Sequence, residues 1–130
     1  MIGLDTNVLV RYLSQDDPKQ SARATALIDS FTPENPGYIP LVALVELVWV
    51  MQSCYQSKKA EVVAILQMLL TTRELVVENT ETVIKALKVF SGSTADFSDC
   101  LIERSSNKAG CDHCVSFDVN AVKDAGFRQL

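Results

Sequence analysis

The sequence predicts an α/β fold, a three-layer sandwich in which helices flank a central, mainly parallel sheet. Short apolar segments with strand character alternate with helical segments along the chain. No repeat, low-complexity segment or linker interrupts this alternation. The chain has 130 residues, of which 48% are hydrophobic, and this is enough for one domain with its own core. We therefore expect a single domain over residues 1–130.

In the first half of the chain, a short buried strand is followed by residues at helical spacing. The sequence DDP places a proline in the first turn of the next helix. A segment rich in Pro and Gly then ends that helix. We expect strands at residues 2–4 and 38–39, and helices at residues 8–13, 19–31, 41–52 and 58–72.

The second half continues the alternation and ends with a short helix and a tail strand. We expect strands at residues 75–78 and 115–117, and helices that begin at Thr80 or Thr82 and at Asp96. Apolar residues at helical spacing predict the core. They are Trp49, Met51, Val62, Ile65, Leu66, Leu69, Val83, Ile84, Leu87 and Phe90.

Two aspartates stand directly after predicted strands. Asp5 ends the segment MIGLD, Asp118 ends VSFD, and a helix follows each of them. Ligands of open α/β sheets lie beyond the carboxyl ends of the strands, so we expect both acids at the same edge of the sheet. The alternative role is helix capping, because Asp is a favoured N-cap residue.

Glu46 lies in a strongly apolar helix. Its neighbours at helical spacing are Val42, Ala43, Trp49 and Val50, so we expect its side chain to be buried or nearly so. A buried carboxylate needs a hydrogen-bond network, a cation or a metal, because burial without a partner costs several kcal/mol. A single salt bridge is the simpler alternative.

The segment ADFSDCLI places Asp96 and Asp99 on one face of a helix's first turn. Capping and the helix dipole explain this pair without any function. Asp5, Glu46, Asp99 and Asp118 nevertheless form a set that this topology can bring to one crevice. Such carboxylates suit Mg²⁺ or Mn²⁺ and would repel one another without a metal. Metal-assisted phosphodiester hydrolysis is the chemistry that such a site predicts.

The segments DTNVLVRYLSQDDPKQSARA, ADFSDCLI and VSFDVNA, with Glu46 between them, resemble the PIN domain, and specifically VapC-family toxins of type II toxin–antitoxin systems. The resemblance covers nearly the whole chain. It implies a metal-dependent endoribonuclease in which Asp5, Glu46, Asp99 and Asp118 are the catalytic and metal-binding acids. It also implies supporting roles for four further polar residues, which are Thr6, Asn7, Asp96 and Ser116.

The resemblance implies partners as well. The substrate would be a structured cellular RNA, either transfer or ribosomal, and cleavage would use a metal-activated water. The family implies a cognate antitoxin protein and a homodimer. The RNA sequence, the antitoxin type and the number of metal ions are not readable from the sequence.

Charge and composition bear on how the protein could bind RNA and on where in the cell it acts. The chain has 16 acidic and 12 basic residues, so its net charge of −4 equals the number of proposed site acids. Any RNA-binding surface must therefore be local. The candidate cations, for which the sequence shows no common face, are Arg11, Arg23, Lys58, Lys59, Arg104 and Lys108. The alternative role, which we expect for most of them, is a solvated helix surface. The start of the chain does not resemble a signal peptide, and no apolar segment reaches the roughly 20 residues of a membrane span. We expect a cytoplasmic protein.

The cysteines do not suggest a second site. Cys111 and Cys114 have the spacing of a redox or zinc motif, but they lead into a predicted strand, and no second motif supplies further zinc ligands. We expect them to be small buried thiols around the last strand, with reduced cysteines throughout. His113 is the only histidine, and we expect it at a hydrogen-bonded edge.

Two other functions are compatible with the sequence. The first is a non-catalytic, acid-rich α/β module that binds RNA or a protein partner. The second is a phosphoacceptor domain, which the sequence supports less well because it shows no paired acids beside Asp5 and no obvious strand-end lysine.

Overall fold

A computed structural model describes all residues 1–130, and the chain divides into two compact units. The first unit is Met1–Glu78 and the second is Asn79–Leu130. Each has its own parallel sheet and its own helices. No helix is both long enough and apolar enough to cross a membrane.

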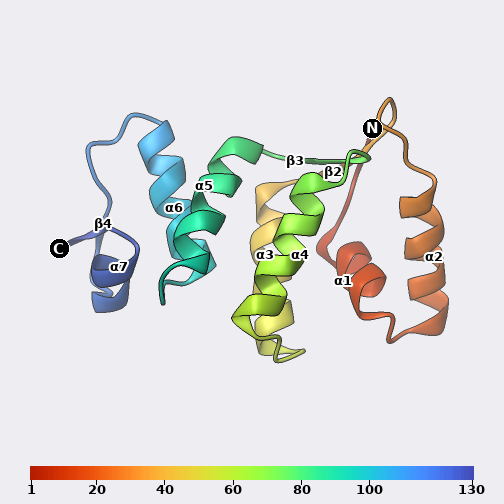
Figure 1. Cartoon of the computed structure of the whole chain (residues 1–130), viewed down its shortest axis with the longest axis horizontal. Helices are drawn as coiled ribbons and strands as arrows, with labels where there is room; N and C mark the ends of the chain where they lie inside the picture. The colour runs from red at the N-terminus through yellow and green to blue at the C-terminus, as the bar shows by residue number, and fades with distance from the viewer. The chain divides into compact units, whose positions relative to one another are not determined.

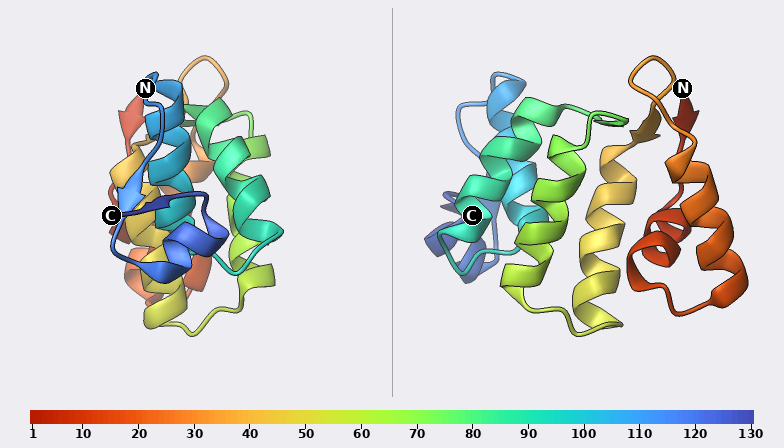
Figure 2. Two further views of the ribbon diagram at one scale, coloured as in Figure 1. Left: turned by 90° about the vertical axis from the view of Figure 1, so that its left-hand side faces the viewer. Right: turned by 45° about the vertical axis from the view of Figure 1, so that its right-hand side comes forward.

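The first unit is built on a three-stranded parallel sheet with the strand order β1-β2-β3. Parallel strands need a long crossover connection, and here each connection consists of two helices. The helix pair between β1 and β2 lies beside the pair between β2 and β3 in Figures 1 and 2. The elements in chain order are β1 Ile2–Gly3, α1 Thr6–Ser14, α2 Pro18–Asp29, β2 Gly37–Ile39, α3 Leu41–Ser53, α4 Lys59–Thr71 and β3 Leu75–Val77.

Local sequence signals explain where these helices begin and end. Asp17 accepts a hydrogen bond from the backbone N–H of Gln20, and Pro18 follows it at the first helical position of α2. Gln15 ends α1 in the left-handed conformation, with φ of 54°. At α3, Glu78 Oε1 accepts from the backbone N–H of Leu41 at 2.9 Å and so caps that helix from the end of β3.

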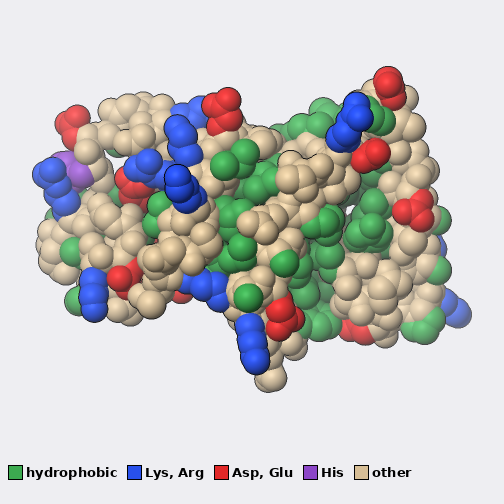
Figure 3. All heavy atoms as spheres, in the orientation of Figure 1, with side chains coloured by type: hydrophobic (Ala, Val, Ile, Leu, Met, Phe, Trp, Pro, Cys, Tyr) green, Lys and Arg blue, Asp and Glu red, His purple; other side chains and the backbone are tan.

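The core of the first unit lies between the sheet and its helices. Leu9 on α1, Ile39 on β2 and Leu47 on α3 have no exposed surface. Of the residues predicted to face the core of α4, Val62, Leu66 and Leu69 are buried and Ile65 is partly exposed. Figure 3 shows hydrophobic side chains gathered beside α4 on the face toward α1. Burial of this kind is the main favourable term for the fold.

Gly37 marks the tightest approach in the sheet. A Cβ at this position would lie 2.5 Å from Cε2 of Phe31 and 3.1 Å from Cδ2 of Leu75. Glycine therefore lets the phenyl ring of Phe31 pack directly on the central strand.

The second unit consists of a pair of helices, a two-stranded parallel sheet and a short helix between the two strands. Its elements are α5 Thr80–Ser91, α6 Phe97–Lys108, β4 Val115–Ser116, α7 Val119–Asp124 and β5 Arg128–Gln129. Helices α5 and α6 pack closely, and the rings of Phe90 and Phe97 meet edge to face with centroids 5.7 Å apart. Lys and Arg side chains gather over this helix pair in Figure 3.

The predicted α/β alternation with parallel strands is confirmed, and the expected elements are all present. One expectation was wrong in detail, because β1 and β4 belong to separate sheets. Asp5 and Asp118 therefore follow strands of two different sheets rather than strands of one sheet.

Candidate functional site

Asp5 stands where β1 gives way to α1. The backbone N–H of Leu4 donates to Tyr38 at 2.8 Å and continues the sheet to this point, and the Asp5 carbonyl accepts the first bond of α1 from Val8. Asp5 occupies the N-cap position, but its side chain caps no backbone N–H. The capping alternative therefore does not account for its exposed carboxylate.

Glu46 is exposed, so the expectation of a buried carboxylate was wrong. The predicted core position of Trp49 was wrong as well, because Trp49 is 64% exposed on the same helix, and so was that of Ile84, which is 50% exposed on α5. Glu46 is still held in place. The buried Thr6 hydroxyl donates to Glu46 Oε1 at 3.0 Å and links the residue after Asp5 to α3.

Asp96 and Asp99 lie at the start of α6. Asp96 is the N-cap residue, yet its side chain makes no capping hydrogen bond. Burial raises the pKa of the Asp99 carboxyl, and the charges of Asp96 and Asp118 raise it further. Asp96 and Asp118 are therefore close enough to Asp99 to disfavour the charged form of the Asp99 carboxyl.

Asp118 does cap a helix. Its Oδ1 accepts from the backbone N–H of Asn120 at 2.9 Å at the start of α7. The Ser116 hydroxyl oxygen accepts from the backbone N–H of Asp118, also at 2.9 Å, and fixes the turn that presents this acid. Capping uses one carboxylate oxygen and leaves Oδ2 without a protein partner.

The predicted acids are thus divided between the units, with Asp5 and Glu46 in the first and Asp96, Asp99 and Asp118 in the second. Within neither unit do three Asp, Glu, His or Cys side chains form a group that could hold a metal ion. The donor chemistry nevertheless fits a hard cation. Asp5 is bonded to no amide, and Asp99 lies in a region of crowded negative charge.

The structure also shows a polar groove that sequence reasoning did not identify. It has a volume of about 590 Å³ and lies between α1 and α2. Its lining consists of Asn7, Val8, Arg11, Gln20, Arg23, Ala24 and Leu27. Arg11 and Arg23 were RNA-binding candidates without a demonstrated common face, and they line this groove together. The helical spacing of the lining residues on each helix is the sequence signal that could have found it.

Arg11 is held in position beside this groove. Its Nε donates to Gln20 Oε1 at 2.8 Å, and its Nη1 pairs with Asp16 Oδ1 at 3.0 Å. Hydrogen bonds from Ser14 and then Tyr55 lower the pKa of Asp16 to about 2, so Asp16 stays charged.

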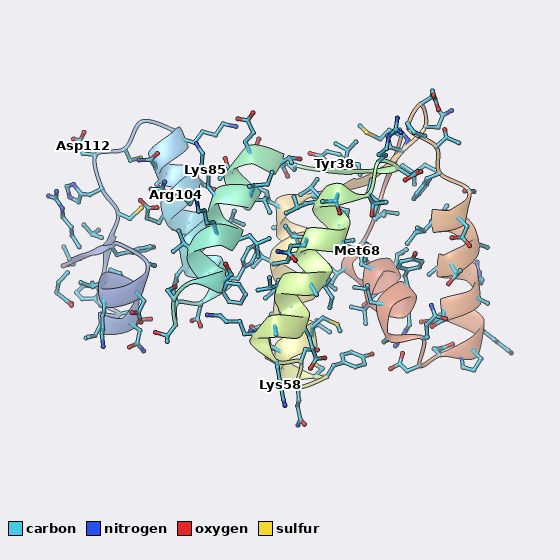
Figure 4. The ribbon with its side chains drawn as sticks, in the orientation of Figure 1. Tyr38, Lys58, Met68, Lys85, Arg104 and Asp112 are labelled. Carbon is cyan, nitrogen blue, oxygen red and sulfur yellow. The ribbon has the colours of Figure 1, made fainter.

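The other cation candidates are arranged differently. Arg104 donates through Nε and Nη2 to the carboxylate of its neighbour Glu103, which occupies much of its guanidinium group. Figure 4 shows two of these candidates, Arg104 on α6 and Lys58 before α4. All four cysteines are free. The expectation of buried thiols around the last strand was wrong, because Cys111 is exposed and Cys114 is partly exposed.

Two comparisons relate this chain to known proteins. The model of the PIN domain family matches residues 2–127 and so spans both units. A protein named VapC ribonuclease from Aquifex aeolicus (strain VF5) is 25% identical over 127 residues, which cover 98% of this chain and 93% of that protein. These matches confirm the resemblance predicted from the sequence, and with it the PIN-like α/β fold class.

Proposed function

We propose, since this chain belongs to the PIN domain family, that it is a metal-dependent endoribonuclease that acts as the toxin of a toxin–antitoxin pair. The observation that carries this proposal is the family match over residues 2–127, because it includes all four candidate acids. The similar protein from Aquifex aeolicus is named as a ribonuclease of the VapC type. One family model across both units also supports a single PIN-like domain over residues 1–130.

The candidate active site consists of four acids. We propose that Asp5, Glu46, Asp99 and Asp118 hold Mg²⁺ or Mn²⁺. The cation would activate a water molecule and neutralise the phosphate during hydrolysis. The raised pKa of Asp99 supports this assignment, because a bound cation would offset both the burial and the neighbouring negative charges that disfavour its charged form.

Four polar residues would support these acids. Thr6 restrains Glu46 through its hydroxyl, and Ser116 fixes the turn that carries Asp118. Asp96 adds negative charge beside Asp99. Asn7 lies two residues after Asp5, in the first turn of α1, and its exposed amide could contact a substrate. Each would orient a catalytic acid or the RNA.

The proposed substrate is a structured cellular RNA, either transfer or ribosomal, and the proposed site of action is the cytoplasm. A cognate antitoxin would inhibit the enzyme, and the toxin would form a homodimer. The similarity to the VapC ribonuclease supports the RNA substrate and the antitoxin, and the homodimer is part of the same proposal.

The decisive variant is Asp5→Asn. We expect it to lower metal-dependent RNA cleavage by at least about 100-fold, which is the typical effect of losing one preorganised catalytic group. We expect its folding to be unchanged, because Asn is as good an N-cap residue as Asp and the Asp5 side chain makes no capping bond. Circular dichroism and thermal denaturation test the fold.

Asp29→Asn is the matched control, because it removes the same charge from an exposed position at the end of α2. It should cleave like the wild type, and chelation by EDTA should stop both until Mg²⁺ or Mn²⁺ is restored. Full activity in Asp5→Asn would refute the site. Metal binding by calorimetry without any RNA cleavage would instead support a non-catalytic binding module.

A further inference from the structure

The groove between α1 and α2 combines two guanidinium groups with a small apolar floor. Arg11 and Arg23 supply two guanidinium groups, and no acidic residue belongs to the lining. Asn7 and Gln20 add amide groups, while the apolar side chains are those of Val8, Ala24 and Leu27. A volume of about 590 Å³ falls in the range of small-ligand sites, about 300–1,000 Å³.

The two arginines differ in their freedom. Gln20 and Asp16 accept from two of the five N–H donors of Arg11, and the Nη2 edge keeps its donors for a ligand. Arg23 is exposed and forms no ion pair. One guanidinium group is therefore prepositioned, and the other is exposed and held by no ion pair. This arrangement suits anions with planar or tetrahedral oxygen atoms.

The groove begins close to the proposed catalytic acids. Asn7 lines it and is two residues from Asp5, on the first turn of α1. Arg11 is one helical turn farther from Asp5 on the same face of α1. A chain of phosphates that leaves Asp5 along this face meets Asn7 first and Arg11 next.

We propose that the α1–α2 groove binds the phosphodiester backbone of the RNA strand adjacent to the cleaved bond, with Arg11 and Arg23 contacting phosphates. This inference rests on the proposed ribonuclease function and adds a substrate-binding subsite to it. The apolar floor packs against ribose or base. A protein segment is a poorer occupant, because stable protein interfaces bury roughly 800 Å² per partner around an apolar centre, and this floor has only three apolar side chains.

The test compares Arg23→Ala with Lys19→Ala. Both remove one positive charge from exposed positions on α2, but only Arg23 lines the groove. Binding of a fluorescent oligouridylate is measured by anisotropy in EDTA, where no metal-dependent cleavage occurs. We expect Arg23→Ala to weaken binding about 5- to 30-fold, as for the loss of one charge-assisted contact. The slope of log affinity against log salt should fall by about 0.7. Lys19→Ala should change affinity by less than about 2-fold.

A second probe separates phosphate contacts from other contacts. An oligomer of the same sequence with an uncharged backbone should bind wild type and Arg23→Ala equally. Equal weakening by both variants, or no weakening by either, would overturn the proposal. So would a result in which Arg23→Ala loses affinity for oligoglutamate but keeps its affinity for RNA, because the groove would then be a protein-binding site.

These outcomes are independent of catalysis. If Asp5→Asn abolishes cleavage and Arg23→Ala binds RNA normally, only the groove assignment fails. If Asp5→Asn cleaves normally and Arg23→Ala binds weakly, the catalytic assignment fails and the groove remains a phosphate-binding site.

Discussion

Replacing Gly37 with alanine should destabilise the protein by a contact that the structure defines. Gly37 is the first residue of β2 and is buried. Its backbone does not need the left-handed conformation, so the effect comes from the added methyl group alone. That methyl would lie 2.5 Å and 2.9 Å from two ring carbons of Phe31, where ordinary contacts are 3.4–4 Å.

The size of the effect follows from how far the ring must move. The ring has to retreat by about 1 Å, and Phe31 is only 7% exposed, so its neighbours must move too. Overpacking of this kind costs about 1–3 kcal/mol. For a chain of this length, that loss lowers Tm by about 3–15 °C.

Thermal and urea denaturation of three variants test this reasoning. Gly3→Ala is the control, because nothing lies within 4 Å of a Cβ at Gly3, and this variant should be slightly more stable than the wild type. Adding Phe31→Leu to Gly37→Ala should recover part of the loss. A Gly37→Ala protein as stable as the wild type, or strict additivity of the two substitutions, would refute the argument.

Three further predictions concern single side chains. Ser21→Ala should raise the free energy of unfolding by about 1 kcal/mol, because the buried Ser21 hydroxyl has no hydrogen-bond partner; an unchanged urea midpoint would contradict this. Thr6→Val should lower the free energy of unfolding by about 0.5–1.5 kcal/mol, because it removes the hydrogen bond to Glu46. The same substitution should have no such effect in a Glu46→Ala background, and a double-mutant cycle measures this difference. Because the pKa of Asp99 is raised in the folded state, this group lowers stability as pH rises above its ordinary value of 3.8. In the absence of metal, the stability of Asp99→Asn relative to the wild type should therefore increase as the pH rises from 3 to 7, as urea titrations measure. A relative stability that falls with pH would show that the Asp99 carboxylate is not destabilised in the folded state.

The sequence predicted the place of Asp5 correctly, because a change from strand to helical spacing depends on local residues alone. It could not say whether the carboxylate caps the helix. Asp5 and Asp118 have the same local sequence context, yet only Asp118 accepts from a backbone N–H of its helix. The difference lies in side-chain orientation, which surrounding packing decides.

The exposure of Glu46 was mispredicted for a physical reason. Helix α3 is apolar on nearly every side, so its pattern does not indicate which face is buried. Leu47 and Met51 face the core, whereas Val42 and Trp49 are exposed. The shared groove of Arg11 and Arg23 was also beyond the sequence, because it depends on how α1 packs against α2.

The unbonded carboxylate of Asp5 has an evolutionary consequence. Under the proposed function, a substitution of Asp5 by Asn removes toxicity without removing a capping hydrogen bond from α1. Cells selected to survive production of the protein should therefore accumulate substitutions at Asp5 that leave a full-length, folded chain.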